Sequence, residues 1–365
     1  MKAIVSKIEL VSLIGKIQNI VPSKPAIPIL GNILIEARDD QLIISATDLT
    51  VSIRAHTEAK VLEEGAITLP ARRFFQLVRE LTAPQIELHA ISPEIAHMNA
   101  GSSHFKLQGM HKSEFPALPD LSDGIHLNIS NATLKEMLAR TVFAAARDDS
   151  RPVLNGLLFQ YAQAAATFIA TDGKRLARTR TSLSPSEAQA GSYILPLKAV
   201  EEMIKIIDKK EESSKLILMA DKCALEAGSI TLISKLISGQ YPDVSPVIPQ
   251  NSAQSVILHR EELISLLRQI ALFTSDESSS VRFSFTPGEL HLSALSGTIG
   301  EGKASMAVNY TGAKLDIAFN PHYFLDILLH SKDETVNFGL TDSYNPGLIT
   351  DSTSAVFVLM PMRLD

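Results

Sequence analysis

The sequence predicts an α+β protein made of three tandem copies of one unit, each with antiparallel sheets and two helices. Two different helix patterns each occur three times along the 365 residues. A Thr-Asp pair occurs at positions 47–48 and again at 171–172, a domain-sized spacing of about 124 residues. A chain of this length usually exceeds what one hydrophobic core supports, so three domains are a natural expectation.

The first helix of each copy has apolar residues spaced for one buried face. In the first copy it follows Ser6-Lys7-Ile8-Glu9, which has the form of a capping box. The apolar positions, at i, i+3, i+4 and i+7, are Leu10, Leu13, Ile14 and Ile17; Leu134, Met137, Leu138 and Thr141; and Leu263, Leu266, Leu267 and Ile270. This spacing predicts three amphipathic helices.

The second helix of each copy opens on a proline, which we expect in the first turn because its missing N–H is not needed there. The three prolines are Pro70, Pro196 and Pro321. Apolar residues follow at +4, +7 and +8: Phe74, Leu77 and Val78; Val200, Met203 and Ile204; and Leu325, Leu328 and Leu329. Three matches at the same offsets indicate a repeated helix.

Between the two helices of each copy, paired runs of residues with strand propensity predict hairpins. The pairs are 32–36 with 42–46, 157–160 with 167–170, and 281–285 with 289–292, the last around a Pro287-Gly288 turn. Further strand-like runs follow the second helices at 85–89, 216–219 and 335–338. Few helices and many strands favour antiparallel sheets with the helix pair on one face.

Proline-rich joints separate the copies. They lie at 116–119 and 242–249 and place the domains at 1–124, 125–249 and 250–365. Open sheet edges invite pairing with a neighbour, and equivalent units satisfy those edges by closing into a ring. Three copies in one chain predict closure by self-association through a head-to-tail interface.

Basic residues recur at equivalent helix positions and predict one cationic surface. The equivalent pairs are Lys16 and Arg140, Arg72 and Lys198, and Arg79 and Lys205. Because the formal net charge is −6, acidic residues must gather elsewhere. Such a face binds phosphates without reading bases, and a chain without tryptophan lacks the stacking platforms of single-strand binders. The alternative is an ordinary solvated helix surface, paired with acids such as Glu202.

We find no nucleotide-binding loop in the sequence. Lys174 follows Gly173, but the earlier glycine and the Ser/Thr of a phosphate loop are missing. The glycines of 297–302 have the wrong order for a dinucleotide motif. The sequence therefore predicts no cofactor.

Metal ligands and catalytic groups are not indicated either. His97, His104 and His111 fall in strand-like and turn-like sequence, which argues against a zinc site. Asp148-Asp149 is flanked by Arg147 and Arg151, so a loop is favoured over a metal site. Cys223 is the sole cysteine, which excludes an internal disulfide. No acid, base and nucleophile form a set.

The chain has the composition of an ordinary folded protein, with 45% hydrophobic and 20% charged residues. No run approaches the roughly 20 apolar residues of a membrane span, and residues 1–9 lack the core of a signal peptide. We therefore expect a cytoplasmic protein.

With its three repeats, the chain resembles the bacterial DNA polymerase III beta subunit family, the β sliding clamps. The resemblance covers the whole chain, and its most specific stretches are 25–32, 69–75, 154–156, 170–177, 234–236, 241–243 and Met360-Pro361-Met362-Arg363-Leu364. It implies a head-to-tail homodimer of six domains, closed as a ring around duplex DNA, with helices inside and strands outside. It also implies a non-catalytic processivity subunit whose partners are DNA polymerase III, the clamp loader and other clamp-binding proteins.

The resemblance also assigns residues to three surfaces. DNA-facing positions are Lys24, Arg72, Arg73, Arg151 and Lys198. A pocket between the second and third domains, which takes a partner's apolar peptide, is Leu154, Thr171, Gly173, Lys174, Arg175, Leu176, Pro242, Val247, Val358, Met360, Pro361, Met362 and Arg363. The subunit joint is Arg73, Leu77, Phe105 and Leu107 against Leu272 and Phe273. Lys174, Pro246 and Pro152-Val153 depart from the family's pattern, which has histidine, arginine and aromatic residues there.

Two other functions compete with this interpretation. One is an interaction scaffold that closes a ring without DNA. The other is a hydrolase with a site assembled from scattered residues, for which Asp148, Asp149 and His104 are the candidates. Neither explains the threefold repeat.

Overall fold

The structure is a computed structural model and describes residues 1–183, 190–208, 211–275 and 279–363; Leu364 of the terminal stretch lies outside these ranges. The chain divides into two compact units. Unit 1 holds Met1–Lys135 with Lys198–Leu236, and unit 2 holds Glu136–Leu197 with Ile237–Asp365. No helix in the described ranges is long and apolar enough to cross a membrane.

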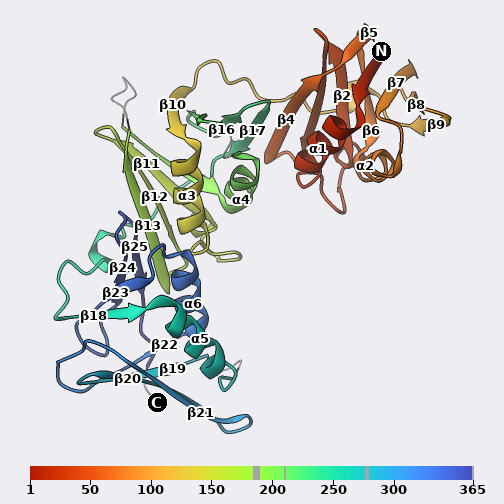
Figure 1. Cartoon of the computed structure of the whole chain (residues 1–365). Coiled ribbons are helices and arrows are strands. Elements are labelled where there is room, and N and C mark those ends of the chain that lie inside the picture. The colour runs from red at the N-terminus through yellow and green to blue at the C-terminus, as the bar shows by residue number, and fades with distance from the viewer. Residues whose placement is uncertain (184–189, 209–210, 276–278, 364–365) are drawn as a thin grey trace. The chain divides into compact units, whose positions relative to one another are not determined.

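Unit 1 contains two antiparallel sheets (Figure 1). The five-stranded sheet has the order β5 (Lys60–Glu63), β1 (Lys2–Ser6), β7 (Gln85–Ser92), β8 (Ile95–Ala100) and β9 (Ser103–Gln108). The eight-stranded sheet has the order β10 (Ile125–Ser130), β15 (Ser213–Leu218), β16 (Lys222–Ala227), β17 (Ile230–Lys235), β4 (Val51–Glu58), β3 (Gln41–Thr47), β2 (Asn32–Arg38) and β6 (Gly65–Pro70). Helix α1 (Lys7–Ile17) packs on α2 (Ala71–Glu80), β3 and β4.

Unit 2 contains a second eight-stranded antiparallel sheet and a four-stranded one. The first has the order β14 (Gly191–Pro196), β11 (Gly156–Ala162), β12 (Ala165–Thr171), β13 (Arg175–Ser182), β25 (Val356–Leu359), β24 (Gly347–Thr350), β23 (Thr335–Leu340) and β18 (Gln254–His259). The other has the order β21 (Gly300–Ala307), β20 (Glu289–Ser296), β19 (Val281–Thr286) and β22 (Leu315–Phe319). Helix α5 (Arg260–Ala271) packs on α6 (Pro321–His330) and on β20 and β21. Helices α3 (Asn131–Val142) and α4 (Leu197–Ile206) run across the sequence boundaries between the units.

Two strand pairs join successive copies of the repeat inside the chain. β4 of the first copy pairs with β17 of the second, with Val51 opposite Ser234. β13 of the second copy pairs with β25 of the third, with Arg175 opposite Leu359. Each time, the strand that follows a three-residue turn meets the last strand of the next copy. The sequence predicted open edges, and these two joints close some of them within the chain.

At each joint, the residue two positions after the proline of the second helix contacts the preceding copy, although the two contacts differ in chemistry. At the first joint, Lys198, two residues after Pro196, forms an ion pair with Asp48 of the β3–β4 turn. At the second joint, Tyr323, two residues after Pro321, lies under the Arg175 guanidinium, 4.6 Å from ring centroid to Cζ. The repeat therefore extends from the sequence pattern to the way the copies dock.

The helix predictions are largely confirmed. Leu10, Leu13, Ile14 and Ile17 are all buried on α1, and the four apolar positions of α3 are buried as well. Leu266, Leu77 and Ile204 are only half-buried. Leu329 is 49% exposed, because Phe324 and Ile327 fill the core side of α6 instead.

Two expectations about helix starts are wrong. Ser6 is the N-cap of α1 but makes no side-chain hydrogen bond to the helix, since it also ends strand β1 opposite Gln85. The other residue of the expected capping box, Glu9, accepts a hydrogen bond from the Thr57 hydroxyl instead (2.8 Å). Pro70 is the N-cap residue of α2 and the last residue of β6, so it lies just outside the first turn. Pro196 likewise ends β14 before α4 begins, and only Pro321 opens its helix from within.

Candidate functional site

An apolar cavity of about 170 Å³ lies in unit 2, over strands β13 and β25. Most of the expected peptide-pocket residues line it: Leu154, Thr171, Gly173, Arg175, Leu176, Pro242, Val247, Val358 and Met360. Lys174, Pro361, Met362 and Arg363 are not among its lining residues. Arg151, Asp243 and Val244 line it although sequence reasoning did not place them there. We call this space the peptide cavity.

The turn between β12 and β13 forms one wall of the peptide cavity and is held by its own side chains. Thr171 Oγ1 accepts a hydrogen bond from the Gly173 amide (3.1 Å). Asp172 Oδ1 accepts from the amides of Lys174 and Arg175, both at 2.9 Å. Gly173 has φ +83°, and a Cβ there would lie 3.3 Å from the Arg151 guanidinium. Glycine thus suits both the backbone and the space.

Arg175 is fixed by charge and by aromatic rings. Its guanidinium forms ion pairs with Asp172 (3.2 Å) and with Asp326 of α6. It also lies over the rings of Tyr323 and Phe143, at 4.6 and 5.4 Å. Such stacking and pairing suit arginine's planar group. Because its charge is already neutralised, Arg175 acts as a rigid wall of the cavity. No local pattern in the sequence pointed to these distant partners.

A segment that we call the strap, residues 237–248, covers the same face of the sheet. The Tyr241 hydroxyl accepts a hydrogen bond from the Thr171 amide (3.1 Å). Burial raises the pKa of Tyr241 to about 12, so this hydroxyl stays neutral. Tyr241, Val244 and Ile248 share one buried cluster with Leu154 and Val358. The strap is thereby fastened across the sheet beside the cavity.

The C-terminal segment closes another side of the site. The Met360 amide donates to the Lys174 carbonyl (2.9 Å), and the Met362 amide donates to the Ala318 carbonyl (2.8 Å). Met360 is 37% exposed. Methionine adapts its shape to varied apolar partners. Pro361 and Met362 are half-buried, and Arg363 is exposed.

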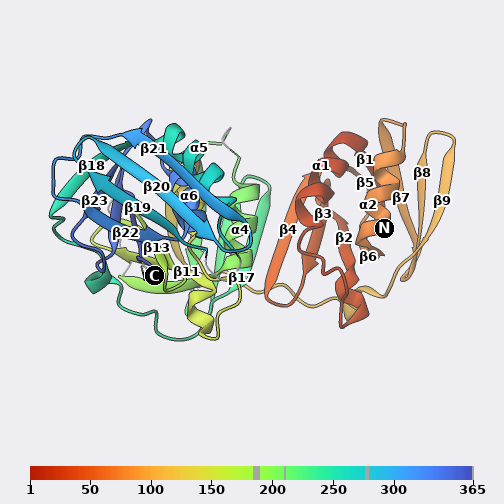
Figure 2. The ribbon, with the colours of Figure 1, turned by 90° about the horizontal axis from the view of Figure 1, so that it is seen from below.

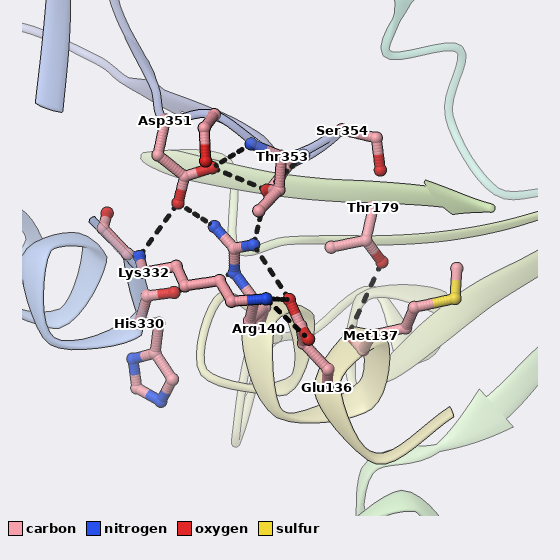
Figure 3. A network of polar contacts seen from close by, with 12 residues as sticks. Glu136, Met137, Arg140, Thr179, His330, Lys332, Asp351, Thr353 and Ser354 are labelled. Carbon is pink, nitrogen blue, oxygen red and sulfur yellow. Dashed lines mark hydrogen bonds and ion pairs between the residues drawn. The ribbon is translucent and has the colours of Figure 1, made fainter. Parts of the chain in front are cut away.

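A buried ion pair fastens the segment between β24 and β25 to helix α3 (Figure 3). Arg140 pairs with Asp351, and their side chains are 7% and 0% exposed. Arg140 also donates to the His330 carbonyl (2.9 Å) and to Thr353 Oγ1 (2.5 Å). The expectation that Arg140 belongs to an outward cationic face is therefore wrong. The Arg140 side chain is buried, where it pairs with Asp351, a residue 211 positions further along the chain.

The Asp351 carboxylate collects several donors in this network. Burial opposes its ionisation, yet hydrogen bonds from the Thr353 hydroxyl and from the Lys332 and Thr353 amides, with the Arg140 charge, hold its pKa below the ordinary value of 3.8. The hydrogen bonds that the Lys332 and Thr353 amides donate to this carboxylate measure 2.9 and 3.0 Å. Asp351 therefore stays charged at neutral pH.

The expected DNA-facing residues differ in their surroundings. Lys24, Arg72 and Arg73 are exposed side chains. Lys198 forms an ion pair with Asp48, and Arg151 forms one with Asp149 (2.9 Å) while lining the peptide cavity. Burial opposes ionisation of Asp48, but Lys198 and the amides of Val51 and Thr50 lower its pKa.

The expected joint residues lie on the two units. Phe105 and Leu107 are half-buried on β9, at one edge of the five-stranded sheet. Arg73 and Leu77 lie on α2. In unit 2, Leu272 follows α5 and is 73% exposed, and the ring of Phe273 lies 2.5 Å from where a Cβ on Gly302 would be. Gly302 is on β21, an edge strand.

No group of three or more metal-binding side chains occurs among the described residues. His97 and His104 lie on neighbouring strands, as the strand-like sequence predicted, and His104 bonds to Asn99 (2.9 Å). The Asp149 pKa falls to about 2 because Arg151 donates to it through its side chain and backbone. Cys223 is buried, which raises the pKa of its thiol to about 12.

Comparisons with known proteins agree on one family. Models of the DNA polymerase III beta subunit match three times: the N-terminal domain over residues 1–119, the central domain over 128–243 and the C-terminal domain over 245–363. The Beta sliding clamp of Chlamydia trachomatis is 52% identical over 364 residues, covering 100% of this chain and 87% of that protein. The Beta sliding clamp of Escherichia coli K12 is 31% identical and covers 100% of both.

Solved structures give the same result. A DNA polymerase sliding clamp from Bacillus subtilis superposes with a TM-score of 0.95 at 26% identity, covering 100% of both chains. A beta sliding clamp from Caulobacter crescentus has a TM-score of 0.94 at 29% identity, covering 100% of this chain and 99% of that one.

Proposed function

The chain belongs to the DNA polymerase III beta subunit family and has the function of a sliding clamp, and on this premise we propose how it performs that function. Two copies close head to tail into a ring of six domains, bounded near residues 124 and 249 in each chain, around duplex DNA. The ring catalyses no reaction itself. It holds DNA polymerase III, and in turn the clamp loader and other clamp-binding proteins, on DNA in the cytoplasm.

The observation that carries this proposal is one pair of unmatched strand edges. Inside the chain, β4 pairs with β17 and β13 pairs with β25, always the strand after the three-residue turn with the last strand of the next copy. In the third copy the strand after the turn is β21, which is a sheet edge. In the first copy the last strand is β9, the outer strand of its sheet (Figure 2). A second chain supplies the missing partner of each.

The first internal joint gives the register that we propose for this pairing. Val51 is the first residue of β4 and faces Ser234, the fifth residue of β17. The same positions in the other two strands are Gly300 of β21 and Leu107 of β9. Antiparallel pairing then places Glu301 opposite Lys106 and Gly302 opposite Phe105.

The side chains suit that register. Glu301 and Lys106 carry opposite charges, and both are exposed. Gly302 leaves room at the edge, and the Phe273 ring beside it offers Phe105 an aromatic contact. Phe105 and Leu107 alternate with exposed residues, so they face the core side of the extended sheet.

A charge-swap experiment tests ring closure. Glu301→Lys and Lys106→Glu each place like charges opposite one another at two joints per ring, so each should weaken dimerisation roughly 10- to 100-fold, from about 1 kcal/mol per pair and joint. The double variant should recover most of the affinity in sedimentation experiments. A double variant as weak as the single ones would refute the register.

A second experiment tests encirclement of DNA. The clamp is loaded on nicked circular duplex by its cognate loader and ATP, purified by gel filtration, and the DNA is then linearised. A topological ring should stay on the circle and leave the linear form. Arg72→Glu and Arg73→Glu, each made alone, should reduce loading, because these exposed cations contact phosphates. Arg54→Glu on β4, which changes the charge by the same amount, serves as the control. Equal retention on linear DNA would contradict encirclement, and no retention on either form would favour the scaffold without DNA.

The peptide cavity is the proposed docking site for partner proteins. Its apolar lining from Leu154, Leu176 and Val358 suits aliphatic or aromatic anchors of a short peptide, and its walls are fixed in advance. The Lys174 carbonyl accepts a hydrogen bond from the Met360 amide, so Lys174 shapes the cavity through its backbone. The replacement of the family's histidine by Lys174 therefore matters less for the cavity.

A further inference from the structure

A second cavity lies on the same face of the unit 2 sheet as the peptide cavity. Its volume is about 530 Å³, within the usual range for ligand sites. Leu158, Ile169 and Ile194 form its apolar floor, and each is about 5% exposed. Gln160 and Ser192 are exposed residues at its rim. We call it the flanking cavity.

The strap separates the two cavities and belongs to both. Pro242, Asp243 and Val244 line the peptide cavity on one side and the flanking cavity on the other. The strap is held at its start, where the Ile237 amide donates to the Ile194 carbonyl (2.9 Å), and in its middle by the Tyr241 hydroxyl. Both cavities are therefore formed before a ligand arrives, and they share three lining residues.

We propose that the flanking cavity binds the residues next to the anchored motif of a clamp-binding protein, so that the partner's chain crosses the strap at 242–244. This inference rests on the proposed role of the peptide cavity. The peptide cavity lies over β13 and β25, and the flanking cavity lies over β12, β11 and β14. Two strand spacings of ~4.8 Å separate β13 from β11, a distance that three or four extended residues span.

The lining defines the chemistry of the flanking segment. Amide and hydroxyl groups of Gln160, Ser192 and Gln240 offer donors and acceptors to an extended main chain. Among the residues that the structure describes, Asp243 is the one charged residue that lines the flanking cavity. Hydrogen bonds from the Ser245 amide and hydroxyl lower the Asp243 pKa, so it is a carboxylate at neutral pH. A lysine or arginine beside the motif is thus favoured at the crossing.

Peptide binding to the full-length dimer tests the inference. The probes are a fluorescent five-residue peptide from the clamp-binding motif of the cognate polymerase and versions extended by four native residues at either end, with a lysine placed beside the motif. One extension should lower Kd about tenfold in anisotropy titrations. Ser192→Arg, on edge strand β14, should remove that gain and leave the short peptide's Kd within twofold.

Two further variants sharpen the result. Asp243→Asn should reduce the gain of the lysine-bearing extension and not that of an alanine-bearing one. Ser229→Arg, an exposed residue in the β16–β17 turn of unit 1, should change neither Kd. An extension that gives no gain, or a gain that survives Ser192→Arg, would overturn the flanking cavity while leaving the peptide cavity intact. A short peptide that does not bind would overturn both.

Discussion

Replacing Arg140 with methionine should release the segment between β24 and β25 from helix α3. The guanidinium is 7% exposed and Asp351 is fully covered, so the change leaves a buried carboxylate without its counter-charge. Removing one partner of a buried pair costs about 3–5 kcal/mol. We expect the lower part of that range, because Asp351 keeps the amides of Lys332 and Thr353 as donors.

Hydrogen exchange measures this effect locally, which matters because a multidomain chain does not unfold in one step. The Lys332 and Thr353 amides report directly, since both donate to Asp351. A loss of about 3 kcal/mol should speed their exchange roughly 100-fold. Asp351→Asn should speed the exchange of at least one of these amides, because Lys332 and Thr353 donate to different carboxylate oxygens and asparagine keeps only one acceptor oxygen. Lys16→Met, at the equivalent exposed position of α1, is the control.

The pH dependence follows from the same carboxylate. Because the folded pKa of Asp351 lies below its ordinary value of 3.8, its contribution to stability is complete above that value and is lost as pH falls through the lower folded pKa. Protection of the two amides in the native protein should therefore fall at acid pH and stay constant near neutrality. Exchange in Arg140→Met within threefold of the native rate would refute the assigned role of the pair.

Three other outcomes are expected. Gly173→Leu should abolish peptide binding yet leave the melting temperature within a few degrees, as measured by anisotropy and calorimetry; retained binding would contradict the cavity's assignment. Deleting residues 360–365 removes Met360 and should abolish polymerase binding while sedimentation still shows a dimer; a truncated clamp that still supports processive synthesis would argue against the site. Cys223, whose thiol is buried and has its pKa raised to about 12, should react with a disulfide reagent only after unfolding, so rapid labelling of the native protein would refute its burial.

The helices and hairpins could be predicted because their signals are local. The stripe from Leu10 to Ile17 and the Pro287-Gly288 turn depend on neighbours a few residues away. Arg140 could not be placed in this way, because helix spacing alone puts it outside, and its partner Asp351 comes from a different copy. Long-range ion pairs leave no periodic trace in a sequence.

The peptide cavity, too, could be predicted from the sequence only in part. Family resemblance supplied most of its lining, but the roles of Asp243 and Val244 depend on the strap folding over the sheet, which follows from Tyr241 reaching Thr171, 70 residues earlier. The partners that neutralise Arg175 come from α3 and α6 as well as from its own turn. These contacts decide that Arg175 shapes the site and does not offer a free charge.

The repeat explains why the second joint has an apolar cavity lined by glycine. The first joint has the same turn. There, Thr47 Oγ1 accepts a hydrogen bond from the Leu49 amide (3.0 Å), and Asp48 Oδ1 accepts hydrogen bonds from the amides of Thr50 and Val51. Leu49 takes φ +75°, close to the +83° of Gly173, so this backbone tolerates a side chain despite a cost of about 1 kcal/mol.

What differs between the joints is the set of side chains on a shared backbone. By strand register, Ser52 and Lys235 stand where the second joint has Leu176 and Met360. At the first joint, the turn carries the Leu49 side chain and its strand neighbours are polar. At the second joint, the turn has Gly173 without a side chain, and its strand neighbours are apolar. The proposed binding site thus differs from the first joint by one small residue at a repeated turn and by two apolar strand positions. A cavity for a partner can thus form at one joint without any change to the strand pairing that joins the copies within the chain.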